Sequence, residues 1–218
     1  MNLHRSVAVH GEALRAAGLS RTAMVMAAGH GKRRSPCPAA PGLGTIARRR
    51  MSSTAGIVLI GNEILSGKIA DANAAYLCRE LRALGVDVRR IGVVPDEVDA
   101  IATEVGACAR AWDLVFTSGG VGPTHDDVTI EGVARALGVP VVRHPALVAL
   151  LRDHYGEALN EAHLKMAEVP EGAELVVGGS LRFPTIMAGN VYVLPGVPEI
   201  FRQKFEALRE RFRGEPYH

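Results

Sequence analysis

Residues 117–127, T-S-G-G-V-G-P-T-H-D-D, have the composition of a loop that binds an anion. Glycines at positions 119, 120 and 122 allow a tight turn and let backbone N–H groups approach a ligand without a Cβ clash. A helix predicted to begin at about Val128 would add the positive end of its dipole. Gly119, Gly120 and Gly122 are therefore predicted to form a phosphate-binding loop.

Two adjacent carboxylates, Asp126 and Asp127, close this segment. Carboxylates next to a phosphate would repel it unless a divalent cation lies between them, and hard oxygen ligands suit Mg²⁺. The alternative is that they cap the next helix or complement its dipole, as we expect of one of the two. Because Thr124 and His125 are adjacent, we predict that Asp126 and Asp127 contact a metal or ligand. His125 alone is more typical of a loop histidine than of a catalyst.

A second polar segment, residues 61–67, follows a predicted strand. Its Asn62 and Glu63 could read the hydroxyls, amides or ring nitrogens of a ligand, and Asp71 and Asn73 follow shortly after. A turn followed by a helix N-cap would explain Asp71 equally well, but would not explain Asn62 and Glu63 together.

A third segment, residues 194–198, lies between a predicted strand and a predicted helix. Pro195 and Pro198 make it rigid, whereas Gly196 permits close approach of a ligand. As a helix start the segment is ordinary. If all three segments meet, Pro195 and Gly196 form the third wall of one pocket.

The elements that must position these segments alternate along the chain. Apolar runs predict strands at 57–60, 86–94, 113–117, 139–142, 174–177 and 190–194. Helical spacing predicts helices from Asp71 to Leu84, from about 95 to 105, 128 to 137 and 198 to 212, with two short helices within 145–168. This alternation predicts a three-layer α/β/α fold with a mostly parallel sheet. Ligands bind beyond the carboxyl ends of such strands, where the three segments lie.

Composition excludes several classes of protein. Apolar residues make up 48% and charged residues 22%, as in ordinary globular proteins. No apolar run reaches the roughly 18 residues of a membrane helix, so we predict no membrane partner. The three cysteines, widely spaced and odd in number, indicate reduced thiols and a cytoplasmic protein. Aromatic residues are only 5%, and no basic patch carries interleaved aromatics, so no nucleic-acid partner is predicted.

Residues 1–50 differ from the rest of the chain in charge. They hold nine Lys/Arg and one acid, whereas residues 51–218 hold 16 basic and 22 acidic groups. We predict that residues 1–50 are a basic, disordered extension or a start-site artefact, and that the working domain is 51–218. A transit peptide or a tail for anionic partners are the alternatives. Residues 22–36 resemble the Gly-rich loop of sugar-phosphate nucleotidyltransferases, but no such fold follows them.

The three segments, in this order, resemble those of the MoaB/Mog-like molybdenum-cofactor-biosynthesis domain. G-N-E-I-L-S-G-K-I-x-D-x-N, T-S-G-G-V-G-P-T-H-D-D-V-T-x-E and L-P-G-V-P are similar to the versions in competence-damage-inducible protein A and in the N-terminal domain of FAD synthase. The resemblance spans roughly residues 56–212. It implies phosphate contacts for Ser118 and the three glycines, Mg²⁺ at Asp126 and Asp127, and pocket walls at Asp71, Asn73, Pro195 and Gly196.

This resemblance implies binding of molybdopterin or a related phosphorylated nucleotide, in cofactor assembly or carriage, by a protein that forms a homo-oligomer. One alternative is a divalent-metal-dependent pyrophosphatase acting on ADP-ribose or FAD, with Asp126 and Asp127 as catalytic residues. A second is a scaffold without a ligand. The stretch S-L-R-F-P at 180–184 departs from the competence-protein pattern and leaves the substrate open.

Overall fold

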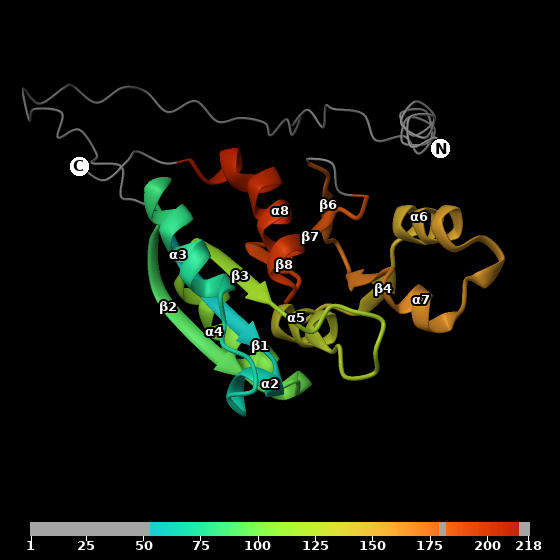
Figure 1. Ribbon diagram of the computed structural model, residues 1–218, viewed down its shortest axis with the longest axis horizontal. Helices are drawn as coiled ribbons and strands as arrows, with labels where there is room; N and C mark the ends of the chain where they lie inside the picture. The colour runs from blue at the N-terminus through green and yellow to red at the C-terminus, as the bar shows by residue number, and fades with distance from the viewer. Residues whose placement is uncertain (1–52, 179–181, 214–218) are drawn as a thin grey trace, which may run out of the picture. The chain divides into compact units, whose positions relative to one another are not determined.

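A six-stranded sheet lies at the centre of the computed structural model, which describes residues 53–178 and 182–213 (Figure 1). These residues belong to one unit, residues 50–218, and the predictions for residues 1–50 lie outside the described residues. The strand order is β2-β1-β3-β8-β7-β6. The strands, in chain order, are β1 (Thr54–Ile60), β2 (Asp87–Val94), β3 (Leu114–Ser118), β6 (Glu174–Val176), β7 (Thr185–Ala188) and β8 (Val191–Leu194).

The half of the sheet that positions the three polar segments is parallel. β1 pairs in parallel with β2 and β3, and β3 pairs in parallel with β8. The run Ile57–Ile60 is buried throughout, as expected of a central strand covered on both faces. β7 pairs antiparallel with β8 and β6. The prediction of a mostly parallel sheet is confirmed, with an antiparallel extension at one edge.

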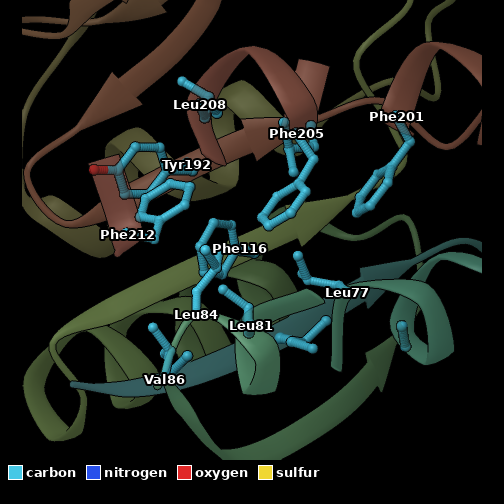
Figure 2. Packing of buried hydrophobic residues seen from close by; sticks show 14 of the residues in the cluster. Leu77, Leu81, Leu84, Val86, Phe116, Tyr192, Phe201, Phe205, Leu208 and Phe212 are labelled. Carbon is cyan, nitrogen blue, oxygen red and sulfur yellow. The ribbon is translucent and has the colours of Figure 1, made fainter. Parts of the chain in front are cut away.

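Helices cover both faces of this sheet. On one face, α3 (Asn73–Ala83) and α8 (Pro198–Leu208) enclose a core rich in aromatic rings, with the 3₁₀ turn Arg209–Phe212 at its end (Figure 2). Phe116 stacks on Tyr192 at 5.3 Å between ring centroids. On the other face lie α4 (Val98–Ala111) and α5 (Thr129–Leu137), whose core is aliphatic. The predicted three layers are confirmed.

A smaller unit projects between α5 and β6. It consists of the two-stranded antiparallel ribbon β4 (Val141–Arg143) and β5 (Glu168–Pro170), with helices α6 (Pro145–Tyr155) and α7 (Glu161–Lys165) and the 3₁₀ turn Gly156–Ala158 between the strands. Four buried side chains form its own small core: Leu147, Leu151, Ala167 and Val169. The two helices predicted within residues 145–168 are confirmed.

Several local predictions were wrong or incomplete. β5 and β7 were not predicted as strands, and the polar segment at residues 61–67 forms a short helix, α2 (Asn62–Leu65), rather than a loop. β7 was missed because it is only four residues long, although Gly189 (φ 59°) and Asn190 between it and β8 are a hairpin signal. The predicted strand at 139–142 begins at Val141. No helix among the described residues is long and apolar enough to cross a membrane.

Candidate ligand-binding site at the carboxyl edge of the sheet

Three segments far apart in the sequence meet at a buried junction beyond the ends of β3 and β8. The Asn73 side-chain amide, at the start of α3, donates to Ser118 Oγ at 3.0 Å and to the Gly196 carbonyl at 2.8 Å. Ser118 Oγ lies 3.4 Å from the Pro195 carbonyl oxygen, to which it donates. Asn73 is 4% exposed and Ser118 is 3% exposed. The structure therefore brings Asn73, Ser118, Pro195 and Gly196 together.

One atom of this junction has no partner. Asn73 Oδ1 is buried and accepts no hydrogen bond from any described residue. A buried acceptor left in this state costs roughly 1–3 kcal/mol, which is why such atoms are rare in folded proteins. An N–H or O–H group of a ligand would satisfy it. Asn73 Oδ1 is therefore a candidate contact for a ligand.

Two of the three glycines in residues 117–127, Gly119 and Gly120, are required by the backbone. Gly119 has φ 111°, and a Cβ there would overlap the Ile60 carbonyl oxygen at the end of β1. Gly120 has φ 62°, and a Cβ there would overlap the Thr129 hydroxyl. Only glycine avoids both the strain and the overlap at these positions. The predicted tight turn is confirmed at both residues.

Hydrogen bonds to α5 fix the direction of this loop. The Thr129 hydroxyl donates to the Gly119 carbonyl at 2.9 Å, and Thr129 N donates to the Gly120 carbonyl at 3.1 Å. Gly119 N donates to the Leu194 carbonyl of β8 at 3.2 Å. The N–H groups of Gly120, Val121 and Gly122 have no partner among residues 53–178 and 182–213, so they are free to bind an anion. Thr129 was not singled out from the sequence, although it lies within the quoted motif.

The two carboxylates differ in their surroundings. Asp127 Oδ2 accepts from Thr124 N at 3.0 Å and from the Thr124 hydroxyl. The Asp126 side chain is 65% exposed, 4.0 Å from His125 Nδ1. The polar Thr124 side chain close by and the backbone N–H of Asp126 itself hold the pKa of Asp126 below its ordinary value, so the carboxylate stays charged.

A metal ion held by Asp126 and Asp127 would need further coordinating oxygens from a bound ligand. Among the described residues, no group of three or more His, Cys, Asp or Glu side chains could hold an ion. Mg²⁺ commonly takes only one or two carboxylates and completes its shell with water and substrate phosphate oxygens. Asp126 and Asp127 fit this pattern, because a phosphate held by the neighbouring N–H groups would supply the remaining oxygens.

A lysine from the smaller unit reaches the same loop. Lys165 Nζ, at the end of α7, donates to the Thr124 carbonyl at 2.5 Å. A hollow of about 290 Å³ adjoins this contact, and Gly122, Asp127 and Lys165 line part of it. Nothing in local spacing could have found Lys165 as a site residue, because it lies 41 positions from Thr124.

Three of the predicted residues lie apart from the junction or are engaged elsewhere. The Asp71 carboxylate accepts from Asn73 N at 3.1 Å and from Ala74 N at 2.9 Å, so it caps α3. Asn62 and Glu63 are exposed on α2, and the Asn62 backbone N–H donates to the Asp96 carboxylate at 2.8 Å. No hydrogen bond joins either side chain to Ser118 or Gly196 within the described part of the chain.

Comparison with known proteins gives a consistent result. Residues 56–213 match the family described as "probable molybdopterin binding domain". An Archaeoglobus fulgidus protein is 41% identical over 162 residues, which are 74% of this chain and 70% of the relative. A "probable FAD synthase" of Caenorhabditis elegans is 38% identical over 75% of this chain, but only 36% of the relative is covered.

A "CinA-like protein" of Desulfosudis oleivorans is 39% identical over 69% of this chain and 38% of its own length. This chain thus spans little more than a third of the FAD synthase and the CinA-like relative. Among solved structures, the protein CinA with unknown function from Thermoplasma acidophilum is 33% identical, with a TM-score of 0.68 over 74% of this chain and 98% of that one.

Proposed function

The chain belongs to the probable molybdopterin binding domain family, related to molybdenum cofactor biosynthesis, and from this premise we propose that it binds a phosphorylated pterin or nucleotide. The observation that carries the proposal is the buried, unpartnered Asn73 Oδ1. Asn73 is hydrogen-bonded to Ser118, which lies two residues before Gly120, the first of the residues with a free N–H group. An acceptor and a set of donors thus lie in neighbouring parts of one site.

Each half of the site suits a different part of such a ligand. Phosphate oxygens accept hydrogen bonds, and the N–H groups of Gly120, Val121 and Gly122 can donate them. Asn73 Oδ1 can accept only from an N–H or O–H group, which a bare phosphate at neutral pH does not supply well. The ligand should therefore carry a hydroxyl or ring N–H group in addition to its phosphate.

A divalent cation would fit beside this phosphate. Asp126 and Asp127 would hold it, and when bound it would neutralise the repulsion between carboxylates and phosphate. The Thr124 N–H and hydroxyl already fix the orientation of Asp127. Ligand binding should therefore strengthen when Mg²⁺ is added, and Asp127→Asn should reduce this strengthening.

Titration calorimetry with a phosphorylated pterin tests the proposal. Gly122→Ala should weaken binding about tenfold or more, because the new Cβ would lie 2.6 Å from Asp127 Oδ2, which cannot retreat without leaving Thr124. Gly172→Ala is the control for a general loss of stability: Gly172 has φ 78°, unlike Gly122, and lies in an open turn outside the site, so ligand affinity should not change there. Binding that is undetectable at millimolar ligand, or unchanged in Gly122→Ala, would contradict the proposal.

A second candidate is a phosphoanhydride hydrolase, favoured by the position of Asp127 and Lys165 along one hollow beside the glycines. Water oxygen would form a bond to phosphorus while the anhydride P–O bond breaks, and the leaving phosphate would carry away the electron pair. The Lys165 ammonium would offset the developing negative charge. A divalent cation, when bound, supplies activated water.

The assay for this candidate is AMP release from ADP-ribose or FAD in the presence of Mg²⁺ or Mn²⁺. Asp127→Asn should abolish release, whereas Asp153→Asn, on the exposed part of α6, should leave it intact. Release that survives Asp127→Asn would assign the activity to another site or a contaminant. If the protein neither binds nor cleaves any of these compounds, the scaffold alternative is the better description.

A further inference from the structure

A groove lies between α3 and β2, the outermost strand on one side of the sheet (Figure 1). Its volume is about 590 Å³, and its lining consists of Cys78 and Arg82 of α3 together with residues 86–91. Neither Asn73 nor any residue of the glycine loop contributes to this lining. The groove is therefore a surface that the proposed function does not use.

The outer edge of β2 can offer backbone hydrogen bonds to an added strand. β2 stands last in the strand order, and within residues 53–178 and 182–213 it pairs with β1 alone. This pairing skips Arg89 but is regular from Arg90 to Val94. A strand with one partner leaves a row of N–H and C=O groups unpaired along its other edge.

This edge is also exposed in its side chains. Ile91, which lines the groove, is 51% exposed, and Val93 is 40% exposed. Native edge strands are commonly covered by a helix or a loop, whereas these two branched apolar side chains are open to solvent. Side chains of this type pack well against those of a neighbouring strand. The edge therefore offers apolar contact as well as backbone groups.

Arginines give the groove a positive charge. Arg82, Arg89 and Arg90 line it together with a single acid, Asp87. Arg89 Nη2 lies 2.6 Å from Asp87 Oδ2, and Arg90 Nε lies 2.5 Å from Glu104 Oε1. Arg82 is exposed and forms no ion pair or side-chain hydrogen bond with any residue that the structure describes. The groove is thus a basic surface with one unpaired guanidinium, although the domain as a whole holds more acidic than basic groups.

We propose that this groove binds an extended, acidic peptide segment of another protein, which adds to β2 as a further strand. In strand addition, backbone hydrogen bonds supply affinity, and contacts with alternate side chains supply specificity. A carboxylate of the segment pairs with Arg82, and an aliphatic side chain of the segment contacts Ile91. The partner is therefore a segment in which acidic and aliphatic residues alternate.

Charge disfavours a second copy of this chain as the occupant. Pairing of two β2 strands would bring the arginines of two grooves together, and like charges on neighbouring strands are destabilising. An acidic segment avoids this repulsion.

Titration of the whole protein with short fluorescent peptides tests this inference. A peptide that alternates Glu and Val should bind at least about tenfold more tightly than one that alternates Lys and Val. Tripolyphosphate, an anion that cannot form a strand, should not displace the acidic peptide. Equal binding of both peptides, or ready displacement by tripolyphosphate, would overturn the peptide groove.

Arg82→Glu should weaken binding of the acidic peptide about fivefold or more, because an attraction becomes a repulsion. Arg79→Glu is the matched control, since Arg79 is exposed on the same helix but does not line the groove. It makes the same change in net charge and should alter affinity less than about twofold. Equal losses in the two variants would mean that net charge alone attracts the peptide, and would overturn the assignment to Arg82.

Hydrogen exchange distinguishes strand addition from attraction between charges. Saturating acidic peptide should slow exchange of the outward-facing backbone N–H groups of residues 90–94 by about tenfold or more, because each gains an acceptor. Unchanged exchange in the complex would overturn strand addition.

The inference is independent of the proposed function, and the same variant separates the two. Arg82→Glu should leave the affinity for a phosphorylated pterin unchanged, because Arg82 lies outside the site at the carboxyl edge. Failure of the acidic peptide to bind would overturn this inference and leave the proposed function standing.

Discussion

The two ends of strands β1 and β3 are both polar, but they use their polar groups differently. At the amino end, Asp113 Oδ2 accepts from Thr54 N at 2.8 Å and from the Thr54 hydroxyl at 2.7 Å, and Asp113 N donates to Thr54 Oγ1 at 3.2 Å. At the carboxyl end, Asn73 uses both amide hydrogens and leaves Oδ1 buried without a partner.

The difference shows that polar composition alone does not locate a binding site. The Asn190 side chain, also at the amino end, donates to the carbonyls of Ala109 and Trp112 and thereby ties β8 to the end of α4. The Trp112 indole N–H is also buried and unpartnered at this end. At the carboxyl end the unpartnered acceptor belongs to Asn73, which is hydrogen-bonded to Ser118 at the start of the glycine loop, and the proposed ligand site rests on this combination.

Gly119→Ala should cause the largest loss of unfolding free energy, because the backbone is closely packed at the carboxyl end of the strands. The new Cβ would overlap the Ile60 carbonyl oxygen at a backbone φ of 111°, so we expect a loss of at least about 3 kcal/mol in unfolding free energy. Gly138→Ala isolates the cost of positive φ, because Gly138 (φ 71°) has open space around it; it should cost about 1–2 kcal/mol. Urea denaturation measures both, and equal losses would mean that the loop adjusts.

Asn73→Ala and Asp113→Ala test the contrast between the two ends directly. Asn73→Ala should weaken binding of a phosphorylated ligand about tenfold, because the acceptor is lost. It should also destabilise the fold, since two donated hydrogen bonds are lost. Asp113→Ala should lower the unfolding free energy and change ligand affinity less than about twofold. Calorimetry measures the ligand affinity of both variants, and urea denaturation measures their unfolding free energy. Similar losses of affinity in the two variants would contradict the proposed difference between the two ends.

Asp71→Ala tests a carboxyl-end side chain whose hydrogen bonds are made within the protein, in contrast to Asn73, whose Oδ1 has no partner. Because the Asp71 carboxylate accepts from two N–H groups of α3, its removal should cost about 1 kcal/mol in stability. Asp71→Ser, which retains a capping oxygen, should recover much of that loss. Ligand affinity should change little in either variant. A large loss of affinity that serine does not repair would instead make Asp71 a pocket residue.

The smallest expected effect is the pH dependence of the unfolding free energy contributed by Asp113, at the amino ends of β1 and β3. Donation from the Thr54 N–H and hydroxyl lowers the pKa of Asp113. Its stabilising contribution is therefore present above the unfolded pKa, about 3.9, and is lost as the pH falls through the folded value. We expect Asp113→Asn to be less stable than the parent by under about 1 kcal/mol at pH 6, because solvent screens this exposed group. Urea denaturation from pH 6 to 3 should show the difference shrinking, and a difference that grows on acidification would contradict this assignment.

Local patterns were sufficient for the elements of the parallel half. Helical spacing of Leu77 and Leu81 places both against the sheet, where they are fully buried, and the apolar run Ile57–Ile60 is the central strand. The requirement for glycine at 119 and 120 also followed from the sequence. β7 could not be predicted with the same ease, because this four-residue strand is held by its two partners, β8 and β6, rather than by its own pattern.

The amino-acid sequence by itself determined which loops are polar, which contain the glycines needed for tight turns, and that parallel strands would bring these loops to one edge of the sheet. The tertiary structure decided which polar atoms are hydrogen-bonded. The Asp71 carboxylate accepts from two backbone N–H groups at the start of α3, whereas Asn73 Oδ1 has no hydrogen-bond partner among the described residues. It also brought Lys165 to Thr124 across 41 positions. The physical reason is that hydrogen bonding is directional and short-ranged, so whether a group is satisfied depends on neighbours that only folding assembles.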